Sequence, residues 1–136
     1  MRTKEGEEHM TRINCVPVKE LTDKHLGAEY RELPRLFGQI QKAIERGESP
    51  DDPRNPTEYK LGKGHTRFFY NKVLWLSTRY AQLVDECKKR GRVVNHPRIP
   101  HFAYQFTNDW WGHMWTPTPE ALELNRQRIQ ERLNGT

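Results

Sequence analysis

The sequence predicts an all-α protein: a compact single domain of three helices joined by long irregular loops. Two long runs space their apolar residues alternately by four and three, as one face of an α-helix requires. A third run opens with residues typical of a helix start. No stretch alternates between apolar and polar residues as a strand does. The chain has 136 residues, enough for one domain with one core.

The first helix is predicted from about Asp23 to Gly47. Its apolar residues are spaced 4-3-4-3-4 and are Leu26, Tyr30, Leu33, Phe37, Ile40 and Ile44. Thr22 or Asp23 can cap its start. Pro34 lies inside the pattern, and because its nitrogen carries no hydrogen, the bond to the Tyr30 carbonyl is lost. We therefore expect the helix to bend at Pro34.

The second helix follows a loop. Residues 47–63 are rich in glycine, proline and charge, which predicts an irregular connection. The next apolar residues are again spaced 4-3-4-3-4 and are Phe69, Val73, Leu76, Tyr80, Leu83 and Cys87. Basic residues occupy the last turn, where they complement the helix dipole, and Gly91 ends the helix. Residues 92–117 are predicted to be irregular.

The third helix is predicted from Thr118 to about Leu133. Thr118 is a typical N-cap, Pro119 suits the first helical position and Glu120 suits the first turn. The apolar stripe of this helix is weaker than the other two and consists of Ala121, Leu122, Ile129 and Leu133.

An aromatic segment precedes the third helix and holds Trp110, Trp111 and Trp115. These rings can cover a small core, or they can stack on bases and wedge into a DNA helix. Hydrophobic residues make up only 34% of the chain, so its core needs large rings to close. We therefore favour the core interpretation.

The net charge is +5, and residues 1–9 contribute −1 to it, so the basic character lies in the rest of the chain. A basic surface suits a polyanion, although a helical domain with incidental positive charge fits equally well. The two cysteines, Cys15 and Cys87, imply no disulfide framework, and Cys87 falls on an apolar stripe. No His, Cys or carboxylate cluster has metal-ligand spacing. We expect no metal and no cofactor.

No apolar run approaches the length of a membrane span, and residues 1–9 contain no apolar stretch of a signal peptide. We expect a cytoplasmic protein without membrane contact, which is nucleoid-associated when bound to DNA.

Three charged residues stand together on the first predicted helix. Arg31 and Arg35 are four positions apart, so both guanidinium groups project from one side. Glu32 lies about 100° around the helix from Arg31. Such an arginine pair can bind phosphates, but from the residues alone an ordinary surface pair is the better interpretation.

Four segments carry a resemblance to a known family. They are MTRIN at 10–14, AEYRELPR at 28–35, GKGHTRFFYNK at 62–72 and ECKKRG at 86–91. Together they resemble the pyrimidine-dimer DNA glycosylase/AP lyase family of the phage endonuclease V type. The likeness is dense over residues 10–45 and 61–92.

The resemblance implies a base-excision repair enzyme. Such an enzyme removes UV-induced cis-syn cyclobutane pyrimidine dimers and then cleaves the abasic site by β-elimination. The family's nucleophile is the α-amine of the threonine left after removal of the initiator methionine, which matches Thr11. An α-amine has a pKa of about 7.7–8.0, so a useful fraction is neutral and can form an imine with the sugar. The family's essential carboxylate matches Glu32, which stabilises developing positive charge and takes a proton.

The resemblance also implies which residues bind DNA. They are Arg12, His25, Arg31, Arg35, Arg128 and Arg132. For His25, a capping or structural role fits the residues as well as a role in the site. Arg128 and Arg132 are four positions apart on the third predicted helix. The implied partner is double-stranded DNA containing pyrimidine dimers or abasic sites, bound by a monomer.

Nine residues precede Met10, and they bear on activity because an amide nitrogen is not nucleophilic. We expect translation to begin at Met10, with residues 1–9 not translated or removed and residues 10–136 forming the glycosylase domain. The peptide KEGEE at 4–8 can be encoded only by a purine-rich run of codons. A bacterial ribosome-binding site is similarly purine-rich and lies just before a start codon, here that of Met10. The alternative is an ordinary charged tail. If that tail is retained, the chain is a catalytically silent DNA-binding module of the same fold.

Overall fold

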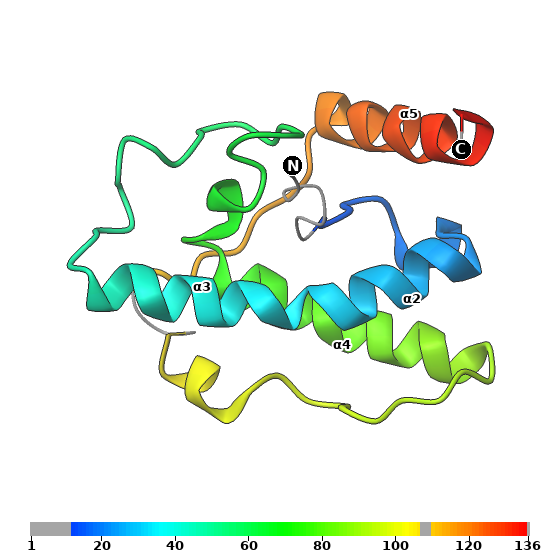
Figure 1. Ribbon diagram of the computed structural model, residues 1–136, viewed down its shortest axis with the longest axis horizontal. Coiled ribbons are helices and arrows are strands. Elements are labelled where there is room, and N and C mark those ends of the chain that lie inside the picture. The colour runs from blue at the N-terminus through cyan, green and yellow to red at the C-terminus, as the bar shows by residue number, and fades with distance from the viewer. Residues whose placement is uncertain (1–11, 107–109, 136) are drawn as a thin grey trace, which may run out of the picture.

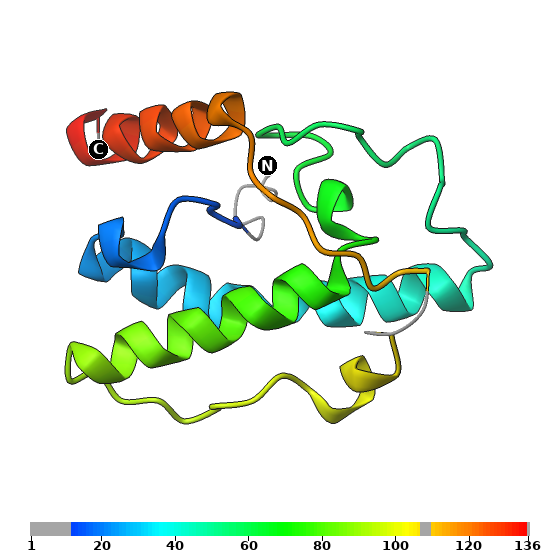
Figure 2. The same cartoon turned by 180° about the vertical axis from the view of Figure 1, so that it is seen from behind.

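The computed structural model describes residues 12–106 and 110–135. Its elements in chain order are η1 (Val18–Glu20), α2 (Asp23–Glu32), α3 (Pro34–Glu45), η2 (Arg67–Phe69), α4 (Val73–Lys89), η3 (His101–Phe106) and α5 (Pro119–Gly135). The predicted all-α class is confirmed, because the described residues form helices and no strand. Helix α4 packs along α2, and the N-terminal segment passes between α2 and α5 in both views (Figures 1 and 2).

The predicted bend divides the first long helix into α2 and α3. The Leu33 N–H still donates to the Glu29 carbonyl at 2.9 Å, and the Leu36 N–H donates to the Leu33 carbonyl at 3.0 Å. Leu33 keeps helical dihedral angles, so the chain turns at Pro34 without leaving the helix. Gly47, with φ of +86°, ends α3 where predicted.

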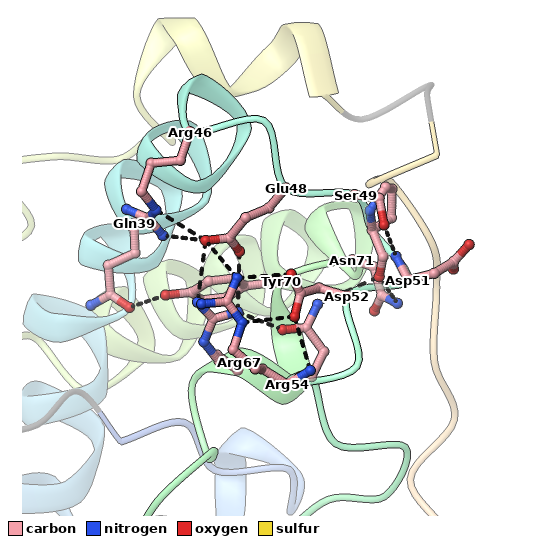
Figure 3. Close-up of polar contacts among 12 residues, drawn as sticks. Gln39, Arg46, Glu48, Ser49, Asp51, Asp52, Arg54, Arg67, Tyr70 and Asn71 are labelled. Carbon is pink, nitrogen blue, oxygen red and sulfur yellow. Dashed lines mark hydrogen bonds and ion pairs between the residues drawn. The ribbon is translucent and has the colours of Figure 1, made fainter.

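The loop after α3 is held together by Glu48 (Figure 3). Its carboxylate accepts hydrogen bonds from Arg46 at 2.8 Å and from Arg67 at 3.2 Å, and it forms an ion pair with Arg54 at 3.3 Å. The hydrogen bond from Arg67 is the main cause that lowers the pKa of Glu48. The predicted loop is therefore a connection with specific polar contacts, which fixes η2 against the end of α3.

Helix α4 begins later than predicted. The expected helix includes Phe69, but Phe69 lies in η2, and Lys72 leaves the helical region with φ of −125° and ψ of 43°. The Val73 N–H then donates to the Trp111 carbonyl at 3.0 Å, and Lys72 forms an antiparallel bridge with Gly112. A segment distant in sequence thus satisfies the first turn of α4, and local spacing does not reveal such a partner.

Helix α5 has the predicted start but a different inner face. The Thr118 hydroxyl accepts a hydrogen bond from the Ala121 N–H at 3.0 Å, which confirms the predicted cap. Ala121 is buried and Ile129 packs against the core, but Leu133 is 48% exposed, so its predicted place in the stripe is wrong. Asn125 is fully buried instead. Helix α5 therefore presents a polar side chain to the interior.

Aromatic rings supply much of the core, as the composition indicates. Trp115 contacts the rings of Tyr59, Phe68, Phe69 and Trp75. Trp111 is buried, whereas Trp110 is 78% exposed. The core interpretation is confirmed for Trp111 and Trp115 and is wrong for Trp110.

Both cysteines are buried and free. Within residues 12–106 and 110–135, no helix is long and apolar enough to cross a membrane. The same residues contain no group of three or more His, Cys, Asp or Glu side chains that could hold a metal ion.

Candidate active site

Residues 12–16 form a short irregular segment whose backbone is bonded by side chains from distant elements. Residues 13–16 are buried, so their backbone polar groups need partners inside the protein. Those partners come from α2, α4, α5 and the loop before α4. The side chains that bond to this backbone are Glu32, Tyr59, His65, Arg79 and Asn125.

Glu32 reaches the first described residue of this segment. The Arg12 N–H donates to Oε1 of Glu32 at 3.3 Å. Glu32 occupies the last position of α2 and is partly buried, so its carboxylate faces the N-terminal segment. Met10 and Thr11 lie outside the described residues. The predicted carboxylate thus lies next to the residue that follows Thr11.

His65 holds the next residue. Its Nε2 accepts the Ile13 N–H at 2.8 Å, and its Nδ1 lies 2.7 Å from the Lys60 carbonyl. A carbonyl only accepts and a backbone N–H only donates, so His65 carries its proton on Nδ1. Burial lowers the pKa of His65 to about 4. His65 is therefore a neutral structural ligand of the backbone.

Asn125 of α5 binds the segment from the other side. Its Oδ1 accepts the Cys15 N–H at 2.7 Å and the Val16 N–H at 3.1 Å. Its Nδ2 donates to Oδ1 of Asn14 at 2.8 Å. One fully buried amide therefore ties α5 to three consecutive residues of the N-terminal segment.

A buried ion pair completes these contacts. Nε of Arg79 in α4 donates to Oε2 of Glu29 in α2 at 2.8 Å, and Nη2 donates to Oε1 at 3.1 Å. Nη1 of the same arginine donates to the Val16 carbonyl at 2.6 Å. Oε1 of Glu29 also accepts from Nδ2 of Asn14 at 2.9 Å. Both charges are thus shared among several hydrogen bonds, as burial of an ion pair requires.

Cations from both ends of the chain meet beside Glu32. Burial lowers the pKa of Arg12, and the positive charges of Arg128 and Arg132 lower it further, whereas Glu32 raises it. These effects place the two α5 arginines near Arg12. Nε of Arg128 is buried and has no hydrogen-bond partner among the described residues. An anionic ligand at this position would supply the missing acceptor.

His25 lies in the first turn of α2, near the same cations. Its backbone N–H donates to the Thr22 hydroxyl at 3.2 Å, and its ring Nδ1 is 2.7 Å from the same oxygen. Burial lowers the pKa of His25, and the charges of Lys24, Arg132 and Arg12 lower it further. His25 therefore takes part in the predicted cap and also lies beside the site, so both interpretations fit its position.

Arg31 and Arg35 lie on a different side of the bent helix. Both are exposed, whereas Glu32 is partly buried. Successive helical residues are about 100° apart, so the side that carries Arg31 is not the side that faces the N-terminal segment. The structure therefore places Arg12 beside Glu32 and brings Arg128 and Arg132 near Arg12, whereas Arg31 and Arg35 are exposed.

Sequence reasoning missed the buried polar residues that hold the segment. They are Asn14, Glu29, Tyr59, His65, Arg79 and Asn125. His65 lies within the segment 62–72 that carries the family resemblance, which was the one available signal for it. Asn125 interrupts the apolar stripe of α5 at a core position, and that position could have marked it as a buried polar group.

The family model described as pyrimidine dimer DNA glycosylase matches residues 10–100, which is more than half of the chain. The match includes the whole N-terminal segment with α2, α3 and α4, and it ends before α5. Glu32, His65 and Arg79, which bind the N-terminal segment, therefore all lie within the matched residues. The chain belongs to the pyrimidine dimer DNA glycosylase family.

Proposed function

We propose that this chain excises cis-syn cyclobutane pyrimidine dimers through an imine on the amine of Thr11 and then cleaves the abasic site. The observation that carries the proposal is the 3.3 Å hydrogen bond from the Arg12 N–H to Glu32. Thr11 is bonded directly to Arg12, so covalent geometry alone keeps its nitrogen within about 7 Å of that carboxylate. A sugar carbon bound to the amine is then within reach of Glu32.

The first chemical step uses the α-amine as nucleophile. Its ordinary pKa of about 7.7–8.0 leaves a neutral fraction near pH 7, which a lysine with a pKa of about 10.4 lacks. The nitrogen bonds to C1′ while the bond from C1′ to the base breaks and its electron pair leaves with the base. The attached nitrogen then passes a proton to the ring oxygen O4′, the C1′–O4′ bond breaks, and the sugar ring opens to give the protonated imine. The negative charge of Glu32 stabilises the positive charge that develops on the sugar.

The second step is β-elimination. A base removes a 2′ proton, the imine accepts the electron density, and the C3′–O bond breaks so that the 3′ phosphate leaves. Glu32 is the carboxylate that binds the N–H of Arg12, the residue bonded to Thr11, so we assign the proton transfer to it. The imine itself acts as the electron sink.

The duplex is held by the arginines beside Glu32. Arg128 and Arg132 lie close enough to Arg12 to lower its pKa, and Nε of Arg128 lacks an acceptor among residues 12–106 and 110–135. Phosphates of the strand near the lesion supply both the acceptor and the negative charge. A damaged base is also easier to unstack, which lowers the free energy of flipping it toward the site.

This function requires a free amine on Thr11. We propose that residues 1–9 are absent from the active form and that residues 10–136 form the glycosylase domain. Two preparations test this point: the chain beginning at Met1, and the chain beginning at Met10 with the methionine removed by the host, each checked by intact mass. We expect the second to nick a duplex containing one cis-syn dimer and the first to bind it without nicking. Equal nicking by a preparation whose mass retains residues 1–9 would overturn the assignment.

A further inference from the structure

Gly27 lies in the middle of α2, where a glycine destabilises the helix by about 1 kcal/mol relative to alanine. The glycines with positive φ are Gly47, Gly62, Gly64 and Gly91, so the backbone conformation does not require Gly27. A Cβ placed on Gly27 would lie 2.4 Å from Nη2 of Arg92. The Arg92 guanidinium group occupies the space that a side chain at position 27 would need, which explains the glycine there.

Arg31 reaches the same place from α2 itself. Its Nη1 would lie 3.2 Å from that Cβ, so the guanidinium groups of Arg31 and Arg92 are neighbours. The segment that carries Arg92 is fixed against α2, because the His96 N–H donates to the Tyr30 hydroxyl at 3.0 Å. Two cations, one from α2 and one from the segment after α4, thus converge over Gly27.

Within the described residues, neither Arg31 nor Arg92 forms an ion pair with a carboxylate. The neighbouring arginine Arg90, in contrast, is paired with Asp23 at 3.0 Å and with Glu86 at 2.8 Å. Two unpaired like charges repel each other, and an anion that accepts hydrogen bonds from both relieves the repulsion. Two adjacent guanidinium groups of this kind can bind a small anion with two oxygens that accept hydrogen bonds.

We propose that Arg31 and Arg92 together bind one backbone phosphate of the bound duplex, with Gly27 making room for the second arginine. The proposal rests on the proposed function, in which the chain acts on DNA. A phosphodiester has two free oxygens and matches paired guanidinium groups. Arg31 is exposed on α2 and directly precedes Glu32, and the partly exposed Arg92 lies beside it. A strand that crosses α2 here passes the arginine pair and Glu32.

The first test is Arg92→Gln, with Lys89→Gln as the matched control. Both variants lower the net charge by one, but Lys89 lies on the exposed side of α4 and is paired with Asp85 at 3.2 Å. For Arg92→Gln we expect about tenfold weaker binding of a duplex, measured by fluorescence anisotropy, as loss of a charged hydrogen bond implies. The slope of log K against log salt should decrease by about 0.9, the value for one phosphate contact. Equal slopes in Arg92→Gln and wild type would overturn the proposal.

The second test is Gly27→Ala, which separates binding from folding. The new methyl group meets only the far ends of two flexible side chains, so the helix keeps its structure and gains propensity. We expect the free energy of unfolding to stay the same or rise while duplex affinity falls as in Arg92→Gln. Combining the two substitutions should weaken binding no further than either alone. Additive losses would show that Gly27 and Arg92 act separately, which contradicts the proposal that Gly27 makes room for a phosphate-binding Arg92.

Two further measurements distinguish the sources of the phosphate and the two proposals. If the arginine pair is instead a site for a free anion, inorganic phosphate will raise the melting temperature of wild type more than that of Arg92→Gln. The two proteins will then bind DNA equally. That result would overturn the assignment to DNA. Binding is measured on an undamaged duplex as well as on a dimer. A wild-type protein that binds DNA through Arg92 but never nicks it would support phosphate binding by Arg31 and Arg92 and contradict only the proposed chemistry.

Discussion

The backbone N–H of Arg12 donates a hydrogen bond to Oε1 of Glu32 across 3.3 Å. This contact joins the end of α2 to the residue that follows the proposed nucleophile. Buried side chains of His65, Asn125 and Arg79 bind the backbone of the residues that follow, so hydrogen bonds from distant elements fix this irregular segment. The fold thus holds residues 12–16 between α2 and α5, with the Arg12 N–H against the Glu32 carboxylate.

Substituting Glu32 tests its chemical role. Glu32→Gln keeps an oxygen that accepts the Arg12 N–H and removes only the negative charge and the basic oxygen. We expect strand cleavage to fall by about 10²- to 10⁴-fold, the range for loss of a general base, while affinity for a duplex with a stable abasic analogue changes little. Glu45→Gln is the matched control and should cleave normally, because Glu45 is exposed at the last position of α3. A loss of affinity equal to the loss of cleavage would make Glu32 structural.

Asn125 should contribute to both stability and activity. Asn125→Leu leaves the Cys15 and Val16 N–H groups and Oδ1 of Asn14 buried without partners. We expect the free energy of unfolding in urea to fall by about 3 kcal/mol, and single-turnover cleavage to slow at a temperature where the variant is still folded. Gln127→Leu is the control on the exposed side of α5 and should change stability by no more than about 0.5 kcal/mol. A similarly small change for Asn125→Leu would refute its anchoring role.

His65 makes stability depend on pH in a defined direction. Its pKa is about 4 in the folded protein, against 6.5 as the ordinary value, so the unfolded chain binds more protons between these pH values. Stability is therefore full above pH 6.5 and decreases as the pH falls toward 4, by about 3 kcal/mol from this group. Urea unfolding measured from pH 7 to pH 4.5 should show this decrease.

The matched variant for this measurement is His65→Gln, which offers the backbone an acceptor but does not titrate in this range. Its unfolding free energy should be lower than that of wild type at pH 7, and the gap should narrow as the pH falls toward 4. Parallel curves for the two proteins over the whole range would contradict a buried neutral histidine.

The ion pair between Arg79 and Glu29 should show strong coupling. Arg79→Met leaves the buried Glu29 carboxylate with Asn14 as its one side-chain partner in the described part of the chain, which should cost about 3–5 kcal/mol of stability. Combining it with Glu29→Gln removes the uncompensated charge, so the double variant should be more stable than the sum of the single losses predicts. The unfolding free energies of the four proteins give the coupling directly, and additive losses would show that the pair does not act as a unit.

Local patterns in the sequence predicted the helices well. Pro34, the cap at Thr22 and the glycines at 47 and 91 act through the few residues around them, so their effects follow from spacing alone. The two 4-3-4-3-4 stripes likewise predicted which helix faces are buried. Phe69 is the exception, because the backbone at Lys72 separates it from α4.

The polar interior of the site could not be predicted in this way. His65 contacts Ile13 across 52 positions in the sequence, and Asn125 contacts Cys15 across 110. Such pairs depend on how helices pack, and no spacing within one segment encodes them. The same holds for Leu133: the stripe in α5 is weak because a buried amide takes a core position there and leaves Leu133 to the surface.

Borohydride reduces an imine to a stable amine, so it traps the proposed covalent intermediate on Thr11. The chain beginning at Thr11 is incubated with a dimer-containing duplex and borohydride, and the cross-linked peptide is mapped by mass spectrometry. We expect an adduct on the Thr11 nitrogen, formed equally by Lys72→Gln and lost when the α-amine is acetylated. Lys72 is the lysine to exclude, because burial lowers its pKa to about 8. Efficient trapping on Lys72, or on protein whose α-amine is blocked, would contradict an imine on Thr11.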